Sequence, residues 1–217
     1  MVEAIIFDMD GTLVNSIPIY LSTFERIFQE DMNLEPPADV IRRQFGKNSK
    51  DIMRGILEEM GIESSDTEIE RVLIDVRKGF LERLKDIMIL PGAFELLDEV
   101  EGKYPLALAT SSGRNYTSMV LSNLGLDKYF DAIVTANDVQ QAKPAPDVYL
   151  KAAELLEAKP TRCLAFEDAV YGVRSARSAG MKVVAVTTGS SSKAELLPER
   201  PDHIVTSLKD FDLSILK

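Results

Sequence analysis

From residue 94 onward, this chain alternates short apolar runs with stretches of helical periodicity. The apolar runs fall at 106–109, 132–134, 163–166, 183–186 and 203–205, and the helical stretches fall at 94–101, 115–124, 147–156 and 169–179. This alternation predicts a parallel sheet with helices on both faces, because each crossover helix packs back onto the sheet. A further apolar run at residues 2–7 is expected to be a strand of the same sheet.

Residues 17–86, by contrast, show helical periodicity alone. Phe24 and Phe28 recur at helical spacing, as do Val76 and Phe80. Two breaks, one of them at a pair of prolines, divide this block into roughly four helices. The block therefore reads as an insertion after the first strand. The predicted organisation is an α/β core formed by residues 1–15 and 87–217, with an all-helical cap domain formed by residues 16–86.

Composition excludes several classes of function. A net charge of −10, from 25 basic and 35 acidic residues, argues against a nucleic-acid-binding protein, which needs clustered Lys and Arg. No run reaches the ~20 apolar residues of a membrane span. The N-terminus enters a strand directly, and Cys163 is the only cysteine, so we expect no export signal, no internal disulfide and a cytoplasmic location. One cysteine and one histidine (His203) make a structural zinc site or a Ser-His-Asp triad improbable. The groups that remain as candidates for chemistry are carboxylates, Lys, hydroxyls and a hard metal ion.

Polar side chains follow the predicted strands at the edge where sites form in parallel sheets. Asp8 and Asp10 come directly after the first strand, and such a pair is costly to bury unless a cation or a reaction needs it. Three further groups follow or precede later strands: Thr110-Ser111-Ser112, Glu167-Asp168, and Lys143 in a Lys-Pro-Ala-Pro-Asp segment.

Each of these groups has a simpler interpretation. Asp8 and Asp10 fit an Asp-Gly turn that leaves a strand. Thr110 and its neighbours fit a cap for the helix that begins near Arg114, and Asp168 fits a cap for the helix at residue 169. Lys143 fits a solvated loop lysine. Taken together these interpretations fail, because independent caps are not expected to supply two acid pairs, a hydroxyl cluster and a lysine in this order.

Four ordered segments resemble the motifs of the haloacid dehalogenase superfamily, over essentially the whole chain. The segments are Asp8-Met-Asp10-Gly-Thr-Leu, Leu-Ala-Thr110-Ser-Ser, Lys143-Pro-Ala-Pro-Asp and Phe-Glu167-Asp168-Ala. The resemblance is closest to the branch with a helical cap after strand one, which includes β-phosphoglucomutase, phosphoglycolate phosphatase and sugar-phosphate phosphatases. It implies a Rossmann-like α/β core with an inserted helical cap.

The resemblance also implies a role for each motif residue. Asp8 would be the nucleophile that attacks phosphorus and forms an aspartyl-phosphate. Asp10 would protonate the leaving alkoxide and then activate water. Thr110 and the backbone N–H of Ser111 would donate to phosphate oxygens, and Lys143 would lie between Asp8 and the phosphate. The implied ligands of a Mg²⁺ cofactor are Asp8, the backbone carbonyl of Asp10, Glu167 and Asp168.

Candidate substrate-binding residues lie in two loops. Lys47 and Asn48 fall between two helices of the cap, where the family carries its specificity loop, and Lys50 follows them. A solvated helix start with Ser49 as its cap is the alternative for Lys50. In the core, the substrate-binding candidates are Ser111, Ser112, Arg114 and Asn115, of which the last two also fit ordinary first-turn residues of a helix.

Two positions depart from the pattern of β-phosphoglucomutase, and a third departs from what often follows the first motif. Tyr20 stands where the mutase carries a histidine, Ser49 where it carries a cap arginine for a second phosphate, and Asn15 where an aspartate often follows the first motif. The loss of groups that hold a second phosphate favours simple hydrolysis.

The sequence therefore predicts a Mg²⁺-dependent phosphatase that acts on a small phosphorylated metabolite, most plausibly a sugar phosphate. The alternatives are a phosphomutase with the same intermediate and a non-enzymatic phospho-Asp signalling module. A haloalkanoate dehalogenase is disfavoured because Asp10 and the acidic metal pair are superfluous to it. We expect a monomer with no nucleic-acid or membrane partner.

Overall fold

A central parallel sheet organises the computed structural model, which describes residues 2–216. The sheet has the order β5-β4-β1-β6-β7-β8, and all five of its strand pairs are parallel. Its strands are β1 (Ala4–Phe7), β4 (Leu106–Ala109), β5 (Ala132–Val134), β6 (Cys163–Glu167), β7 (Lys182–Val186) and β8 (His203–Val205). The predicted α/β fold class is confirmed, and strand boundaries differ from the prediction by two residues at most.

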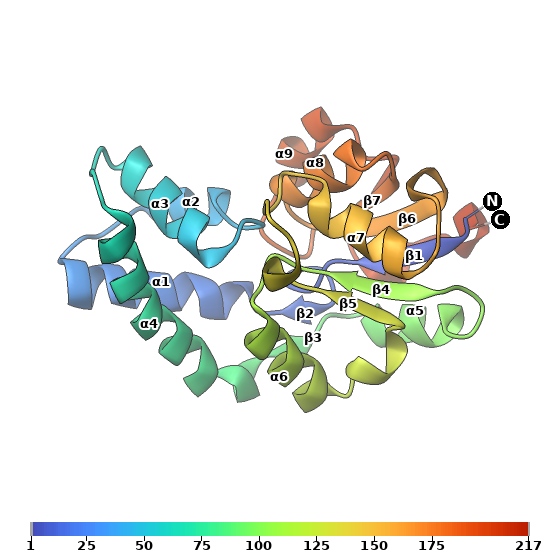
Figure 1. Ribbon diagram of the computed structural model, residues 1–217, viewed down its shortest axis with the longest axis horizontal. Coiled ribbons are helices and arrows are strands. Elements are labelled where there is room, and N and C mark those ends of the chain that lie inside the picture. Colours follow the sequence, from blue (N-terminus) through green and yellow to red (C-terminus); the bar gives the residue numbers. More distant parts are fainter. Residues whose placement is uncertain (1, 217) are drawn as a thin grey trace.

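Alternate residues of each strand feed two separate cores. In β1, Ile5 and Phe7 belong to one hydrophobic cluster, whereas Ala4 and Ile6 belong to the other. This division follows from the period of two in a strand, which sends successive side chains to opposite faces. Helices cover both faces of the sheet (Figure 1). The first cluster includes residues of α5 (Ala93–Val100) and α6 (Arg114–Leu124), and the second includes residues of α7 (Asp147–Leu155) and α8 (Val170–Ser178).

Four helices that pack on one another lie to one side of the sheet, at the left of Figure 1. They are α1 (Ile17–Met32), α2 (Ala38–Arg43), α3 (Ser49–Glu59) and α4 (Asp66–Glu82), followed by a short 3₁₀ turn at Leu84–Asp86. Their predicted apolar stripes are buried, including Phe24, Phe28, Val76 and Phe80. The predicted run of about four helices is therefore confirmed. We refer to residues 16–86 as the helical block.

A small antiparallel ladder joins the helical block to the sheet. The strand β2 (Val14–Asn15) pairs with β3 (Met88–Ile89), so the chain leaves the core and returns to it through adjacent strands. A backbone hydrogen bond of 2.9 Å from Leu90 to Leu13 extends the ladder. These two-residue strands were not predicted, because two residues are too few to show a periodic pattern.

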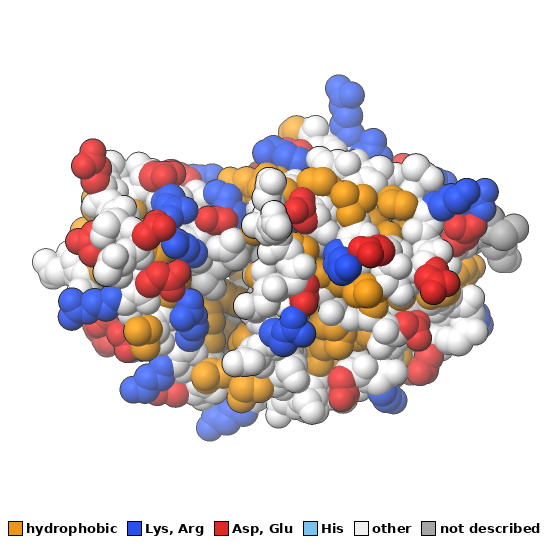
Figure 2. Space-filling view, in the orientation of Figure 1, with side chains coloured by type: hydrophobic (Ala, Val, Ile, Leu, Met, Phe, Trp, Pro, Cys, Tyr) orange, Lys and Arg blue, Asp and Glu red, His pale blue; other side chains and the backbone are white. Residues whose placement is uncertain are grey.

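No helix among residues 2–216 combines the length and the apolar character needed to cross a bilayer. On the face of the molecule drawn in Figure 2, basic and acidic side chains are interspersed rather than separated into a basic patch.

The stacked rings of Phe7 and Phe166 generate a stability prediction. Their centroids are 4.9 Å apart, and both side chains are fully buried at the centre of the sheet. We expect Phe166→Ala to lower the free energy of unfolding by about 3–5 kcal/mol, because the ring leaves a cavity. Urea unfolding monitored by circular dichroism measures this value. Leu155→Ala, at a position that is 51% exposed, is the control and should change it by less than about 0.5 kcal/mol. Equal losses for the two variants would contradict the prediction.

Candidate active site

The carboxyl ends of three adjacent strands deliver the predicted polar groups to one edge of the sheet. Asp8 follows β1, Thr110 follows β4, and Glu167 ends β6, with β1 between the other two. Asp8, Asp10 and Thr110 line one cavity of about 40 Å³, which also contacts the helical block. Parallel strands bring their carboxyl ends together, so residues more than a hundred positions apart share this site.

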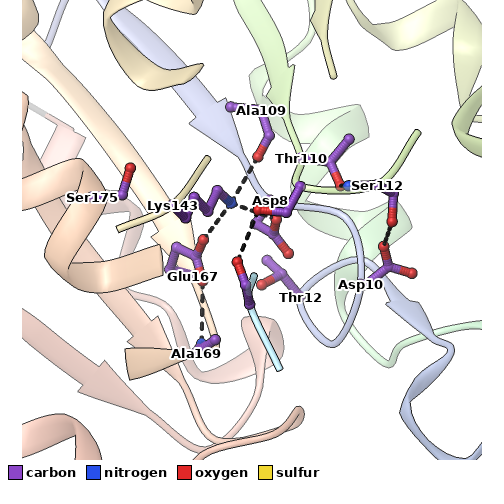
Figure 3. A network of polar contacts seen from close by, with 12 residues as sticks. Asp8, Asp10, Thr12, Ala109, Thr110, Ser112, Lys143, Glu167, Ala169 and Ser175 are labelled. Atoms are coloured by element: carbon purple, nitrogen blue, oxygen red, sulfur yellow. Dashed lines mark hydrogen bonds and ion pairs between the residues drawn. The ribbon is translucent and has the colours of Figure 1, made fainter. Parts of the chain in front are cut away.

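Lys143 lies at the centre of the polar network in Figure 3. Its Nζ donates to Asp8 Oδ1 at 2.7 Å, to Glu167 Oε1 at 2.6 Å and to the Ala109 carbonyl at 3.0 Å. The residue is only 2% exposed, so its interpretation as a solvated loop lysine is wrong. Although burial opposes it, the attraction of Asp8 and Glu167 raises the pKa of Lys143, which keeps the ammonium charged.

Tyr149 is a member of this network that sequence reasoning missed. The residue is fully buried in α7, and its hydroxyl donates to Glu167 Oε1 at 2.9 Å. The Lys143 ammonium lies 4.9 Å from the centroid of its ring. A tyrosine six residues after Lys143 looks like an ordinary core residue of a helix, and only the packing of α7 shows what its hydroxyl meets.

Three buried carboxylates form a candidate cation site. Oxygen atoms of Asp8, Glu167 and Asp168 all lie within 4.8 Å of one another. Burial raises the pKa of Asp8 well above its usual value, although Lys143 opposes this rise. Burial, with repulsion from Glu167, raises the pKa of Asp168 to about 7. One ammonium does not balance three carboxylates, and an all-oxygen donor set suits a hard divalent cation. The residues present therefore fit such an ion.

The two acids after β6 have different surroundings. Glu167 accepts hydrogen bonds on both oxygens: Oε1 from Lys143 and Tyr149, and Oε2 from the backbone N–H groups of Asp168 and Ala169. Four hydrogen bonds fill the acceptor capacity of a carboxylate. Asp168 has fewer partners. Of the two residues, Asp168 is the better placed to offer an oxygen atom to a cation.

Asp168 is held by residues that sequence reasoning did not select. Its Oδ2 accepts from the backbone N–H and the hydroxyl of Ser190, at 2.8 and 3.0 Å, and its Oδ1 accepts from the Thr12 hydroxyl at 3.3 Å. The helix α8 begins at Val170 without a side-chain cap, so the interpretation of Asp168 as a helix cap is wrong. A Cβ on Gly11, which has a φ of +90°, would lie 2.5 Å from Asp168 Oδ2, so only glycine fits this turn.

The Asp10 carboxylate lies apart from the three-carboxylate cluster. In Figure 3 it faces Ser112, whose hydroxyl donates to Oδ2 at 2.7 Å, and Ser16 donates to Oδ1 at 2.6 Å. Burial raises the pKa of Asp10, while the hydrogen bonds from Ser16 and Ser112 oppose the rise. The predicted metal contact of Asp10 was through its backbone carbonyl, and it stays a prediction.

The hydroxyl cluster after β4 makes specific contacts. Thr110 is 1% exposed, and its Oγ1 accepts from the backbone N–H of Ser112 at 3.0 Å. The Ser111 hydroxyl donates to the carbonyl of Gly46 in the helical block at 2.8 Å. The helix α6 has Gly113 at its N-cap with no side-chain cap bond, so the interpretation of this cluster as a helix cap is wrong.

The loop between α2 and α3 reaches the same cavity. Lys47 lines it, donates to Gln44 Oε1 at 2.7 Å and lies 4.3 Å from the centroid of the Tyr171 ring. Asn48 caps α3, since its side chain accepts from the backbone N–H of Asp51 at 3.0 Å. The expected alternative, a cap at Ser49, is therefore wrong by one residue.

A larger cavity of about 730 Å³ adjoins the first, and both are lined by Tyr20, Ser49, Ser111 and Ser112. The remaining predicted substrate residues, Asn48, Arg114 and Asn115, line this second cavity, as does Lys50.

Comparisons with known proteins agree with this geometry. Residues 5–186 match the family described as haloacid dehalogenase-like hydrolase. The chain is 33% identical to a phosphorylated carbohydrates phosphatase of Thermotoga maritima, over 96% of this chain and 99% of that protein. It is 30% identical to the fructose-1-phosphate phosphatase YqaB of Escherichia coli, over 84% of this chain and 95% of that protein.

Comparison with solved structures also identifies a hydrolase with the same fold. A hydrolase from Pseudomonas syringae superposes with a TM-score of 0.89 at 27% identity, covering 96% of this chain and 95% of that one. Membership of a hydrolase family argues against the alternative of a non-enzymatic signalling module. The predicted enzyme class, a phosphatase of the haloacid dehalogenase family, is confirmed. The chain belongs to the haloacid dehalogenase-like hydrolases.

Proposed function

We propose that this protein is a Mg²⁺-dependent phosphatase that hydrolyses a small phosphomonoester, such as a sugar phosphate, through an aspartyl-phosphate on Asp8. One observation carries the proposal: Asp8 and Asp10 line the same cavity, and Lys143 holds one oxygen of Asp8 at 2.7 Å. Two carboxylates with such different surroundings suit a nucleophile and a separate acid–base group. The names of relatives, among them a fructose-1-phosphate phosphatase, support the substrate class.

In the first step, a carboxylate oxygen of Asp8 forms a bond to phosphorus while the bond from phosphorus to the ester oxygen breaks. Asp10 gives its proton to that leaving oxygen, and an alcohol departs. In the second step, Asp10 takes a proton from water as the water oxygen attacks phosphorus. The bond between phosphorus and Asp8 then breaks, which releases phosphate and restores the carboxylate.

The surrounding groups lower the barrier by charge. Lys143 opposes the rise in the pKa of Asp8 that burial causes, which favours the ionised nucleophile, and it would offset negative charge as phosphorus is attacked. The hydroxyl of Thr110 and the backbone N–H of Ser111 are proposed donors to the phosphate oxygens. Mg²⁺, held by Asp8, Asp168 and the backbone carbonyl of Asp10, with the charge of Glu167 behind it, would neutralise the phosphate dianion.

We further propose that the helical block is a cap domain that excludes water during the first step. The hydrogen bond from Ser111 to Gly46 supports this, since it joins the core to the loop that carries Lys47. Lys47 brings a positive charge into the cavity, and its described partners, the Gln44 amide and the Tyr171 ring, are neutral. We place this enzyme in the cytoplasm as a monomer that acts on a metabolite, with neither nucleic acid nor membrane as a partner.

The larger cavity favours hydrolysis over a mutase reaction. Three cationic side chains line it, and each already pairs with a carboxylate: Lys50 with Asp66, Arg77 with Glu70, and Arg114 with Asp138. A second phosphate would have to displace one of these acids. The other polar residues that line this cavity, Asn and Ser among them, suit the hydroxyl groups of a neutral sugar.

Replacement of the nucleophile tests the mechanism. We expect Asp8→Asn to abolish phosphate release from phosphorylated metabolites, because an amide oxygen is a poor nucleophile and forms no acyl phosphate. Steady-state assays with a phosphate-release readout measure this, and circular dichroism checks the fold. Asp75→Asn, an exposed acid of α4, is the matched control and should retain activity. Near-normal turnover by purified Asp8→Asn would contradict the assignment.

The cation site makes a prediction about stability. Mg²⁺ bound to the folded state alone should raise the free energy of unfolding by about 2.7 kcal/mol at a hundred times its Kd. Thermal unfolding with and without MgCl₂ measures the increment. Asp168→Asn should lose most of it, and Asp75→Asn should keep it. The cation assignment is wrong if Mg²⁺ stabilises the wild type and Asp168→Asn equally.

Product analysis separates hydrolysis from the mutase reaction. With β-glucose 1-phosphate and a catalytic amount of glucose 1,6-bisphosphate, we expect free phosphate and glucose, because each cation that lines the larger cavity among residues 2–216 already pairs with a carboxylate. Phosphorus NMR distinguishes these products from glucose 6-phosphate. Accumulation of glucose 6-phosphate without free phosphate would establish the mutase.

A further inference from the structure

The carboxylate of Asp10 is held by hydroxyl groups on both of its oxygens. Ser16, which directly precedes α1, donates to Oδ1 at a distance of 2.6 Å. Ser112, in the loop after β4, donates to Oδ2 at a distance of 2.7 Å. Two short hydrogen bonds from different segments restrict both the position and the rotation of the carboxylate.

A second hydroxyl stands behind Ser112. The Tyr20 hydroxyl lies 3.0 Å from Ser112 Oγ. Because Ser112 has a single hydroxyl proton and directs it to Asp10, Tyr20 is the donor of this pair. With the Asp10 carboxylate as the acceptor, hydrogen bonds run from Tyr20 through Ser112 to Asp10, and each donor polarises the next. The Tyr116 hydroxyl lies beside this chain and bonds to both Asp10 and Tyr20.

The ring of Tyr20 is itself held in place. It is 8% exposed and contacts Phe80 at 4.2 Å, Phe45 at 6.0 Å and Tyr116 at 5.9 Å between ring centroids. Phe80 and Phe45 belong to the helical block, whereas Tyr116 belongs to α6 of the core. The orientation of the Tyr20 hydroxyl thus depends on how the helical block packs against the core.

We propose that Tyr20 and Ser112 are positioning residues that hold Asp10 at the wall of the cavity for proton transfer to the leaving group. Ser112 thereby acts on Asp10 rather than on the distal end of the substrate. The relay makes proton donation depend on the seating of the helical block, since Tyr20 belongs to the block and Asp10 to the core. This inference rests on the proposed function.

The consequence is specific to the leaving group. p-Nitrophenyl phosphate has a weakly basic leaving oxygen and needs little proton donation from an acid. Phenyl phosphate has a more basic leaving oxygen and therefore depends more on that proton. A misplaced Asp10 therefore slows the second ester more than the first. A general loss of structure slows both esters alike.

The experiment compares kcat/KM for the two esters in the wild type, Tyr20→Phe and Ser112→Ala. Tyr20→Phe keeps the ring packing and removes only the hydroxyl. We expect each variant to lose about tenfold on phenyl phosphate, a fraction of what general acid catalysis supplies, and less than about threefold on p-nitrophenyl phosphate. Asp10→Asn should show the same discrimination with a larger loss. Tyr129→Phe is the matched control, because Tyr129 is a buried tyrosine that bonds to Asp98 away from the site and should show no discrimination.

Three outcomes overturn the inference. Equal losses on both esters would mean that the hydroxyls have only a structural role. Unchanged rates would mean that Asp10 needs no such support, and a gain on phenyl phosphate would mean that the hydroxyls hold Asp10 back. Failure of the wild type to release phosphate from either ester would instead overturn the proposed function, on which the inference rests.

Discussion

Lys143 places one positive charge where three parallel strands end, and the rest of the site is arranged around that charge. Its ammonium donates to Asp8 after β1, to the carbonyl of Ala109 in β4 and to Glu167 in β6. Removal of one partner from a buried ion pair costs about 3–5 kcal/mol, because the other charge is left unpaired. The ammonium therefore links the ends of three strands and opposes the rise in the pKa of Asp8 that burial causes.

The proposed binding of an anionic substrate by a protein with a net charge of −10 requires a positive field that is local to the site. Lys143 lies in the floor of the site, and Lys47 enters from the helical block through a loop that Ser111 holds. One ammonium does not balance the three carboxylates beside it, and this excess of negative charge supports the proposed divalent cation. The helical block and the core thus each contribute a lysine to the surroundings of one cavity.

The sheet was predictable because each of its strands carries a local signal. The runs at 106–109, 132–134 and 203–205 match the observed strands, and helix boundaries in the core moved by one residue. The ladder of β2 and β3 was missed because it depends on contact between segments some seventy residues apart. Among the site residues, Tyr149 and Ser190 were missed for a related reason. Neither follows a motif, and each acts only through an acid that the fold brings to it.

The sequence alone shows the motif residues, their order along the chain and the period of the apolar positions, because each of these is a local feature. They suffice to indicate a parallel sheet, an acidic edge and a family. Which hydroxyl meets which carboxylate is a different kind of fact. Ser112 bonds to Asp10 and Asp168 bonds to Ser190, although both residues fit helix caps in the sequence. Helix capping is a contact between near neighbours, whereas these bonds cross 102 and 22 positions, and only the packing of strands and helices sets such distances.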